Sequence, residues 1–485
     1  MSESSEGSAE WLAYLPAHRQ IELFRHRRFS PLDVLEAQIR RIEAGSQSIN
    51  AVTCTHFDEA RLAAKESEVR YHRGEARALE GVSVAVKEEY ESAGWKATAG
   101  SVIFADRNAD QTHPVLDKLR AAGAILHIQT TVPEFFLLGV TWSDLWGITR
   151  NPWNPDFTPG GSSGGSAAAL AAGMATLALG SDMGGSIRIP AALNGLYGSK
   201  PAYGRIASPD PSALVPHASP GSLARDCRDC ILLQNIMCGQ APGCPAVLEP
   251  KLELPLDYQR GAQWKIALCM DQGWAMLDPE IRLNTLEAVR RLRTAGAIVD
   301  EVDLDLDTDD GKLRETIEKA LFSTAIGGEL IELADRKDEL TTYGRRFVEL
   351  ASTMGPLDAK EAAEEALRLY GLMDRNVFQT GYDAIVTPTV ATTRIPADYD
   401  PTTDRPVIEG QVVDSYSGWF LTSLFSLVNW MPVINVPTGL ASSNVPTGLQ
   451  IATRPYADST GAAIALAYAD QTDALPFQRL KIQGR

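Results

Sequence analysis

Apolar and polar positions follow two different periods along the chain, and the order of these periods predicts the fold class. Residues 82–86 form a mostly apolar run that ends on Lys87, and residues 124–128 form a second apolar run. Between them, residues 113–122 have the three-to-four-residue apolar spacing of a helix, which Gly123 ends. A strand, a helix and a strand at this spacing pair in parallel, with helices on the faces of the sheet. We therefore expect an α/β fold with a central mixed, largely parallel twisted sheet that helices cover on both faces.

The same periods continue toward the C-terminus. Residues 265–270 and 297–304 have the pattern of buried strands on either side of an amphipathic helix over 279–294. From 313 to 378 the pattern is almost wholly helical, with acidic faces, and a buried strand pattern returns at 382–389. Near the N-terminus, Ser30-Pro31-Leu32-Asp33 combines a capping serine, a proline and an acid, which predicts a helix start.

Composition and charge restrict the possible partners. The chain has 485 residues, of which 44% are hydrophobic and 22% charged, as in globular proteins with a sizeable core. Its net charge of −17 and pI of 5.0 argue against nucleic acid as the main partner, since phosphate contacts need a basic surface. The acidic N-terminus does not resemble a signal peptide, and no apolar run is long enough for a membrane span. We expect a cytoplasmic protein.

Six cysteines raise the question of a metal or redox site, because Cys227-x-x-Cys230 is followed by Cys238 and Cys244. Residues 227, 230, 231, 234 and 238 repeat at helical spacing, however, and cysteine is among the most buried residue types. A buried helix face is therefore the preferred interpretation, and we expect neither a metal nor a cofactor.

The most distinctive stretch is residues 158–190, in which an alanine-rich segment separates two glycine-serine clusters. The first cluster, 160–166, has too many glycines for a helix interior, which predicts a shaped loop. Residues 167–172 form a strong helix-forming run, 175–179 a short buried strand, and 183–186 a second tight turn.

Glycines before a serine leave backbone N–H groups uncovered, so these groups can converge on an oxyanion beside an attacking hydroxyl. This nominates Ser186 as a nucleophile, with the N–H groups of 183–186, namely Met183, Gly184, Gly185 and Ser186, as the oxyanion hole. No histidine lies near this run, its closest in sequence being His127 and His217. A lysine partly withdrawn from water can accept a proton as a neutral amine, and Lys87 at the end of an apolar strand is the candidate base.

Three segments, GVSVAVKEE, NPWNPDFTPGGSSGGSAAALAAG and LALGSDMGGSIRIPAALNGLYGSKPAYGRI, resemble the core of the amidase signature enzymes. The resemblance implies a Ser–Ser–Lys triad with Lys87 as base, Ser162 as bridging serine held by a cis peptide bond, and Ser186 as nucleophile. Two positions depart from the family pattern. Ser83 stands where proline is usual, and Glu88 stands where aspartate usually follows the lysine, which puts the positioning of Lys87 in question.

The resemblance implies a hydrolase that cleaves C–N bonds of carboxamides through an acyl-enzyme on Ser186, and extends to anilides, esters and carbamates or urethanes. The expected partner is a small-molecule substrate, with no membrane or nucleic acid, and the expected state is a monomer or homodimer. We expect supporting roles for Ser163, Asp182 and Arg188, which fix the shape of the loop and turn. Aromatic and small residues that could line an apolar substrate pocket, or could equally be core, are Phe135, Phe136, Gly139, Trp142 and Trp430.

We find no internal repeat and no linker, so we expect a single domain over 1–485. Its expected parts are N-terminal helices at about 10–75, a catalytic core at about 80–240, a helical substrate-lining region at about 305–380, and a return to the core at about 381–485.

Three alternatives stay open. Residues 161–165 match the G-x-S-x-G elbow of α/β-hydrolases, which would make Ser163 the nucleophile, but a loop and not a strand precedes them. The chain could instead be the amidase-like component of a glutamine-dependent amidotransferase, active only in a complex with transfer RNA. A degenerate binding protein on the same fold is disfavoured because Lys87, Ser162 and Ser186 are all present.

Overall fold

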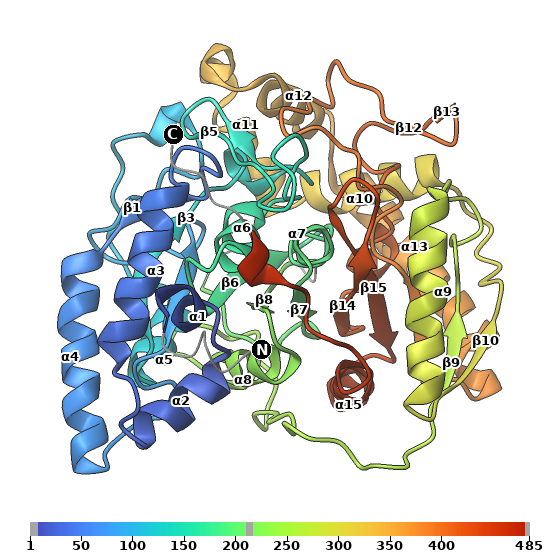
Figure 1. Cartoon of the computed structure of the whole chain (residues 1–485). Coiled ribbons are helices and arrows are strands. Elements are labelled where there is room, and N and C mark those ends of the chain that lie inside the picture. Colours follow the sequence, from blue (N-terminus) through green and yellow to red (C-terminus); the bar gives the residue numbers. More distant parts are fainter. Residues whose placement is uncertain (1–7, 210–216, 481–485) are drawn as a thin grey trace.

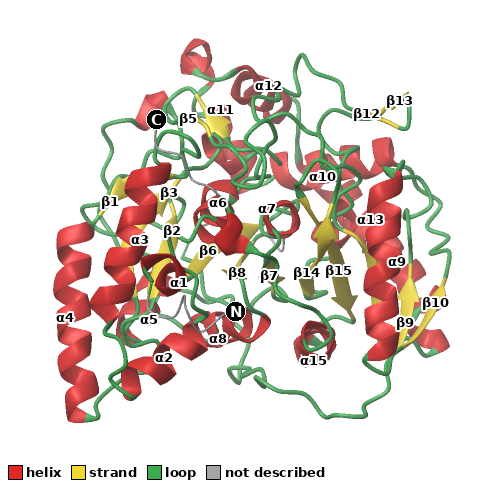
Figure 2. Ribbon diagram, in the orientation of Figure 1, coloured by secondary structure: helices red, strands yellow, loops and turns green. Residues whose placement is uncertain are grey.

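The computed structural model describes residues 8–209 and 217–480, and one sheet of eleven strands runs through its centre (Figures 1 and 2). The strands lie in the order β1 (Val52–Thr55), β3 (Ile125–Thr130), β2 (Ser83–Lys87), β6 (Leu177–Asp182), β8 (Ser219–Ala224), β7 (Tyr197–Lys200), β14 (Val433–Leu440), β15 (Pro446–Thr453), β11 (Ala384–Pro388), β9 (Lys265–Leu268) and β10 (Ile298–Glu301). Two short hairpins lie apart from this sheet, β4 (Trp142–Ser143) with β5 (Gly147–Ile148) and β12 (Val407–Ile408) with β13 (Gln411–Val412).

Helices surround the sheet. They are α1 (Ala9–Ala13), α2 (Ala17–Arg25), α3 (Pro31–Gly45), α4 (Phe57–Arg73), α5 (Pro114–Ala121), α6 (Gly164–Ala171), α7 (Arg188–Asn194), α8 (Cys227–Met237), α9 (Pro279–Thr294), α10 (Asp310–Phe322), α11 (Ala325–Ile331), α12 (Thr342–Ala351), α13 (Pro356–Asn376), α14 (Ser423–Leu427) and α15 (Asp458–Ala469). The expected α/β fold, a mixed sheet with helices on both faces, is confirmed.

Parallel pairing occurs in two blocks of the sheet. Strand β2 is parallel to both β3 and β6, and β9 is parallel to both β10 and β11. The pairs from β6 through β8, β7, β14 and β15 to β11 are antiparallel, as is β1 with β3. Because β2 and β6 run the same way, their carboxyl ends emerge at the same edge of the sheet.

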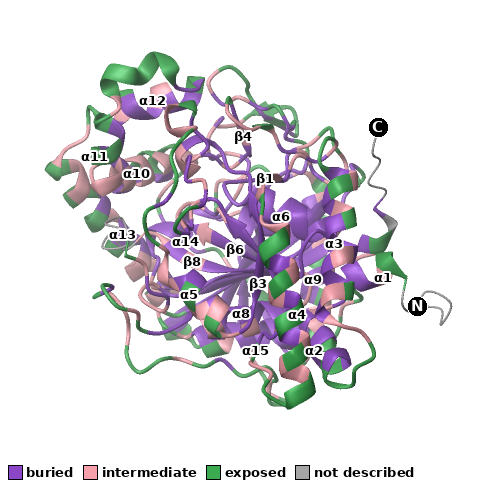
Figure 3. Cartoon of the chain, turned by 90° about the vertical axis from the view of Figure 1, so that its left-hand side faces the viewer, coloured by how far each residue is buried: buried purple, intermediate pink, exposed green. Residues whose placement is uncertain are grey.

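Alternate side chains of the strands enter two different cores, as a strand period of two requires. Val84 and Val86 of β2 belong to the core under α5 and α8, whereas Ala85 belongs to the core that includes α6. Figure 3 shows the strands and α6 as a buried centre, while exposed residues lie on the outer turns of helices such as α4. Both faces of this part of the sheet are therefore covered.

The predicted start of α3 is confirmed in atomic detail. The Ser30 hydroxyl accepts the N–H of Asp33, while the Asp33 carboxylate accepts the N–H of Ser30 at 2.8 Å. This reciprocal arrangement satisfies donors that a helix end leaves without intrahelical partners.

The loop predicted over 160–166 is shorter than expected, because α6 begins at Gly164. A Cβ on Gly164 would lie 2.3 Å from the Thr141 hydroxyl oxygen, and one on Gly165 would lie 2.4 Å from that of Thr131. The glycines of the first helical turn therefore allow close packing against neighbouring segments, which offsets their cost in backbone entropy.

Helices α10, α11 and α12 lie in the upper half of Figure 1, whereas α13 lies lower, on the right, where its buried residues share a core with β9 and β11. Among the described helices, none combines the length and the apolar character needed to cross a bilayer.

Candidate active site

The site begins where β2 ends. Lys87 is the last residue of β2, and its side chain is fully buried. Ser162 stands just before α6, after a cis peptide bond between Gly161 and Ser162. The Nζ atom of Lys87 lies 2.9 Å from the Oγ atom of Ser162. Two residues that the sequence predicts to act together are thus in direct contact.

Ser186 lies in the turn between β6 and α7. It lines the same cavity as Gly161, Met183 and Gly184, and its carbonyl oxygen accepts the N–H of Ser163 at 3.2 Å. Within residues 8–209 and 217–480, no protein acceptor is found for the amide groups of Met183, Gly184, Gly185 and Ser186. These N–H groups are free to bind an anionic oxygen beside the Ser186 hydroxyl.

A buried ion pair fixes the shape of this turn. Arg188 binds the carboxylate of Asp182 through Nε and Nη2, at 2.9 and 2.8 Å. Its other donors reach Thr422, Ser426 and Gln450 at 2.7 to 2.9 Å. Both members of the pair are fully buried, and Arg188 holds the pKa of Asp182 below its usual value against the opposing effect of burial.

Lys87 has two further polar neighbours. Its Nζ lies 2.6 Å from the Ser181 hydroxyl oxygen and 2.7 Å from a carboxylate oxygen of Glu89, and the Ser181 hydroxyl also donates to Glu89. Burial lowers the pKa of Lys87 from its ordinary value, while the charge of Glu89 opposes this shift. A lowered pKa makes the neutral amine, which is the basic form, accessible closer to neutral pH.

Other polar residues near Lys87, in the glycine-serine loop and just after β2, make their hydrogen bonds to groups other than Lys87. The Ser163 hydroxyl donates to the carbonyl oxygen of Ser181 and accepts the N–H of the same residue, both at 3.4 Å. The Ser166 hydroxyl lies 2.8 Å from the hydroxyl of Thr130. The carboxylate of Glu88, which departs from the family pattern, accepts the N–H of Thr98 at 2.9 Å and the hydroxyl of the same residue. Glu88 therefore anchors the loop after β2, and the acid in contact with Lys87 is Glu89.

A cavity of about 130 Å³ opens beside Ser186. Apolar side chains dominate its lining, and α10 supplies several of them. The segment before Gly139 contributes Phe136, Leu137 and Leu138 to the lining. Phe136 has a φ of 65°, in the left-handed region that costs free energy for an aromatic residue. Lining residues that bear on the argument are Phe136, Gly139, Ile317, Leu321, Phe347 and Phe420.

Three of the five residues proposed for the pocket are not among its lining residues. Phe135 packs at its ring edge against Phe104, with centroids 6.3 Å apart. Trp142 donates its indole N–H to the carbonyl of Tyr399 at 2.8 Å, and Trp430 packs at the edge of the core under α13 and α14. The rings or polar atoms of these residues contact other parts of the protein instead of the cavity.

Sequence reasoning missed Ser181 and Glu89. Ser181 could have been found from its place near the carboxyl end of a strand parallel to β2. That place brings its hydroxyl next to the Lys87 amine. The signal for Glu89 was weaker, since two successive acids follow the lysine and only the loop geometry decides which one returns to it.

No metal centre emerges from the described residues near Lys87. One group with metal-ligating atoms, His18, Asp226 and Asp229, lies away from the site. Its oxygen atoms are already used, since Asp229 accepts the N–H of Ala17 and bonds to His18 at 2.8 Å, while Asp226 caps α8. The cysteines of α8 are buried and free, as the core interpretation expects.

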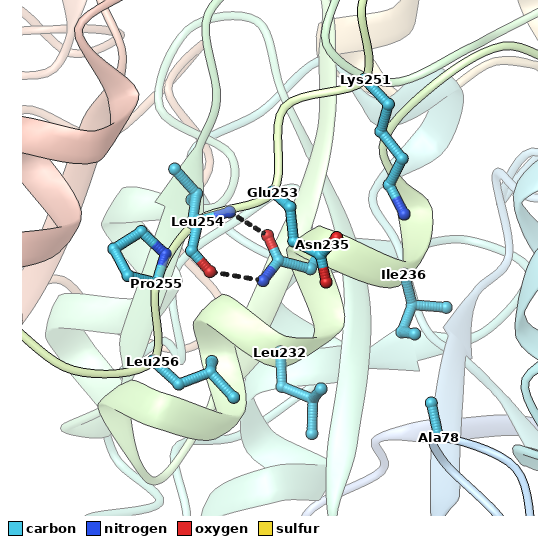
Figure 4. A pocket seen from close by; sticks show the side chains of 9 residues that line it. All are labelled: Ala78, Leu232, Asn235, Ile236, Lys251, Glu253, Leu254, Pro255 and Leu256. Carbon is cyan, nitrogen blue, oxygen red and sulfur yellow. Dashed lines mark hydrogen bonds between the residues drawn. The ribbon is translucent and has the colours of Figure 1, made fainter.

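A second hollow, of about 440 Å³, lies between α8 and residues 251–256 (Figure 4). Asn235 joins its two sides with a pair of 2.8 Å hydrogen bonds to the backbone of Leu254. Ala78, on its rim, precedes β2, whereas Lys87 ends that strand. This hollow contains none of the residues that surround Ser186.

Comparison with known proteins gives consistent results. A family model described as Amidase matches residues 33–460. The chain is 29% identical over 470 residues to the A component of the glutamyl-tRNA(Gln) amidotransferase of Syntrophus aciditrophicus (strain SB), covering 90% of this chain and 92% of that protein. It is 29% identical over 460 residues to an acylamidase of Rhodococcus erythropolis, covering 92% and 93%. The crystal structure of a bacterial aryl acylamidase of the amidase signature family superimposes with a TM-score of 0.88, at 28% identity, over 97% of this chain and 99% of that one.

Proposed function

This chain belongs to the amidase signature family, and from that premise we propose that it is a serine hydrolase that cleaves small amides with an apolar or aryl group. Ser186 is the nucleophile, Ser162 the bridging residue and Lys87 the base. The observation that carries the proposal is the 2.9 Å contact between the buried Lys87 amine and the Ser162 hydroxyl, since Ser162 follows Gly161, which lines the same cavity as Ser186.

The reaction begins when the Ser186 oxygen attacks the substrate carbonyl carbon. The Ser186 proton passes to Ser162 as the Ser162 proton passes to neutral Lys87. N–H groups from Met183 to Ser186 hold the resulting oxyanion, and each such donor commonly contributes about 3 kcal/mol. The C–N bond then breaks as the relay returns the proton to the leaving nitrogen.

Water completes the cycle. It attacks the acyl carbon and gives its proton to the same relay, after which the bond to Ser186 breaks and Ser186 regains its proton. Acylation of Ser186 and hydrolysis of the acyl-enzyme both pass through a tetrahedral oxyanion. The same groups can therefore serve anilides, esters and carbamates, including urethanes.

The apolar lining of the cavity supports the substrate class. Phe136, Phe347 and Phe420 offer rings, and Ile317 and Leu321 of α10 offer aliphatic groups. Two charged residues of α10, Arg314 and Glu318, also line the cavity and pair with each other at 3.0 Å. Transfer of an aryl or aliphatic group from water to such a lining lowers the free energy of binding, whereas a polar amide group would lose hydrogen bonds there.

The similarity to the A components of glutamyl-tRNA(Gln) amidotransferases supports a second candidate, a glutamine amidase that works inside a complex. Glutamine carries an ammonium and a carboxylate, and the two charged residues that line the cavity, Arg314 and Glu318, are already paired with each other at 3.0 Å. Activity of the chain only on glutamine, and only with partner subunits, would favour this candidate.

The test is hydrolysis by the purified single chain of a panel of aryl and alkyl amides, anilides, esters and carbamates. We expect turnover of several aryl or apolar members by the wild type, and a loss of at least about 10³-fold in Ser186→Ala. Retention of activity in Ser186→Ala would refute the assignment of the nucleophile. Equal loss in Ser163→Ala, with the protein still folded, would favour the hydrolase elbow.

A further inference from the structure

The Lys87 amine is surrounded by three oxygen atoms from three segments. They belong to Ser162 before α6, Ser181 on β6, and Glu89 in the turn after β2, at 2.9, 2.6 and 2.7 Å from Nζ. An ammonium group has three N–H donors, so this arrangement satisfies the protonated lysine completely. A neutral amine has two donors and one lone pair. If Ser181 and Glu89 keep the two donors, the lone pair is directed at the Ser162 hydroxyl.

Glu89 is suited to this task because it is not committed to another cation. Within the part of the chain that the structure describes, its ion pair is with Lys87. Its carboxylate also accepts the Ser181 hydroxyl, so one side chain fixes two of the three neighbours of Nζ. The Glu89 side chain is 31% exposed, while that of Lys87 is 0% exposed.

The other charges near Lys87 have partners of their own. Asp182, on β6, is bound by Arg188, and Lys200, on β7, donates to Asn429 at 2.7 Å. Glu88, adjacent to the lysine, is bonded to Thr98.

The remaining packed groups are uncharged or bonded elsewhere. Thr130 of β3 is paired in register with Lys87, and the Phe136 ring centroid lies 5.4 Å from Nζ. Glu134, in the same loop as Phe136, is bonded to Ser101 and Thr341. Glu89 is thus the charged group in direct contact with the amine.

We propose that Glu89 is a positioning residue for the relay: it holds the Lys87 amine toward Ser162, and its charge sets the pH above which Lys87 can accept the Ser162 proton. The inference rests on the proposed function, since it concerns the base of that relay. A carboxylate at contact distance favours the ammonium form, whereas burial favours the neutral amine. Replacing Glu89 with glutamine removes the first effect and leaves the second. The neutral amine then persists to lower pH.

The experiment is the pH profile of kcat/KM, on a slow amide for which acylation is rate-limiting, for the wild type and Glu89→Gln. The profile of kcat/KM reports the ionisation of groups in the free enzyme. Glu91→Gln is the matched control, because Glu91 lies two residues after Glu89 and pairs with Arg107 at 2.5 Å instead of with Lys87. Ser186→Ala is measured in parallel.

We expect the acid limb of the profile, where kcat/KM falls at low pH, to move to lower pH by about one unit or more in Glu89→Gln. The acid limb of Glu91→Gln stays in place. A merely structural role would lower the rate at every pH without moving the limb. Coincident limbs in Glu89→Gln and the wild type would overturn the proposal. Activity retained in Ser186→Ala would instead overturn the proposed function, so the two failures are distinguishable.

Glu89→Asp gives a second measurement that does not depend on the stability of the glutamine variant. It keeps the charge and withdraws the carboxylate by one methylene. We expect the plateau of kcat/KM at high pH to fall about tenfold or more, because a misplaced catalytic group lowers the rate. The acid limb shifts less than in Glu89→Gln. A plateau and limb equal to those of the wild type would contradict the positioning role.

Discussion

At the scale of single residues, the site depends on buried charges that are stabilised in different ways. Arg188 has protein acceptors for all the donors of its guanidinium group, so the Asp182–Arg188 pair is internally complete. Lys87 is held by one carboxylate and two hydroxyls, which leaves it able to lose its proton. The first arrangement suits a scaffold and the second suits a base.

Arg188→Met is expected to destabilise the fold strongly. It leaves the buried Asp182 carboxylate without its partner, and breaking a buried ion pair commonly costs about 3–5 kcal/mol. Chemical denaturation monitored by circular dichroism measures the change. The control is Arg290→Met, which removes an exposed arginine from an ion pair on α9. Equal stability of the two variants would show that the pair does not support the turn.

Activity of the wild type is expected to rise with pH. Burial lowers the pKa of Lys87, and the catalytically competent form is the neutral one, so the rate falls as pH drops through that pKa. The measurement is kcat/KM from about pH 6 to about pH 9, under conditions where chemistry limits the rate. A flat profile would argue against lysine as the base.

At the scale of elements, α6 shows how close packing places Ser162. The first turn of this helix consists of glycine, serine and alanine, whose side chains are small or absent. This turn packs against Thr131 and Thr141. Ser162 lies two residues before Gly164, where α6 begins, so its position relative to Lys87 depends on how closely α6 approaches β3.

Gly165→Ala is expected to reduce both stability and activity. The added methyl carbon would lie 2.4 to 2.5 Å from side-chain and backbone atoms of Thr131, so the helix must move. Such overpacking typically costs about 1–3 kcal/mol. Gly328→Ala in α11 is the control, because its Cβ meets no atom within 4 Å and alanine favours a helix. A neutral effect of Gly165→Ala on unfolding and turnover would contradict this reasoning.

Helix α10 is the element expected to select the substrate. Leu321 lines the cavity, so Leu321→Ala enlarges it and is expected to raise the kcat/KM of bulky aryl amides relative to small ones, by about tenfold for a change of one or two kcal/mol. Leu367→Ala is the control, since Leu367 on α13 is 61% exposed. An unchanged ratio across a graded substrate series would show that this part of the cavity does not contact the substrate.

At the scale of the whole molecule, the sequence predicts the parts that depend on local pattern. The strand, helix and strand from β2 through α5 to β3 follow from apolar periodicity, and the start of α3 follows from its capping residues. The meeting of Lys87 with Ser162 follows from a family resemblance over ordered motifs, and the contact is present.

What the sequence does not predict depends on contacts between distant segments. Antiparallel pairing of β8 with both β6 and β7 is decided by where the chain returns to the sheet. Trp142 is near Ser162 in sequence, but its indole N–H is bonded to the backbone of Tyr399, and Trp430 packs against the core under α13 and α14. The roles of Ser181 and Glu89 required the register of β2 with β6 and the path of a tight turn.

The central claim is that Ser186 carries the acyl group, and the most direct measurement is the location of that group. The purified chain would be incubated with a slowly turned-over aryl carbamate or activated ester, digested and examined by tandem mass spectrometry. We expect the added acyl mass on Ser186 in the wild type, and none on that peptide in Ser186→Ala. Acylation of Ser163 or Ser162 in the wild type, with Ser186 unmodified, would contradict the account.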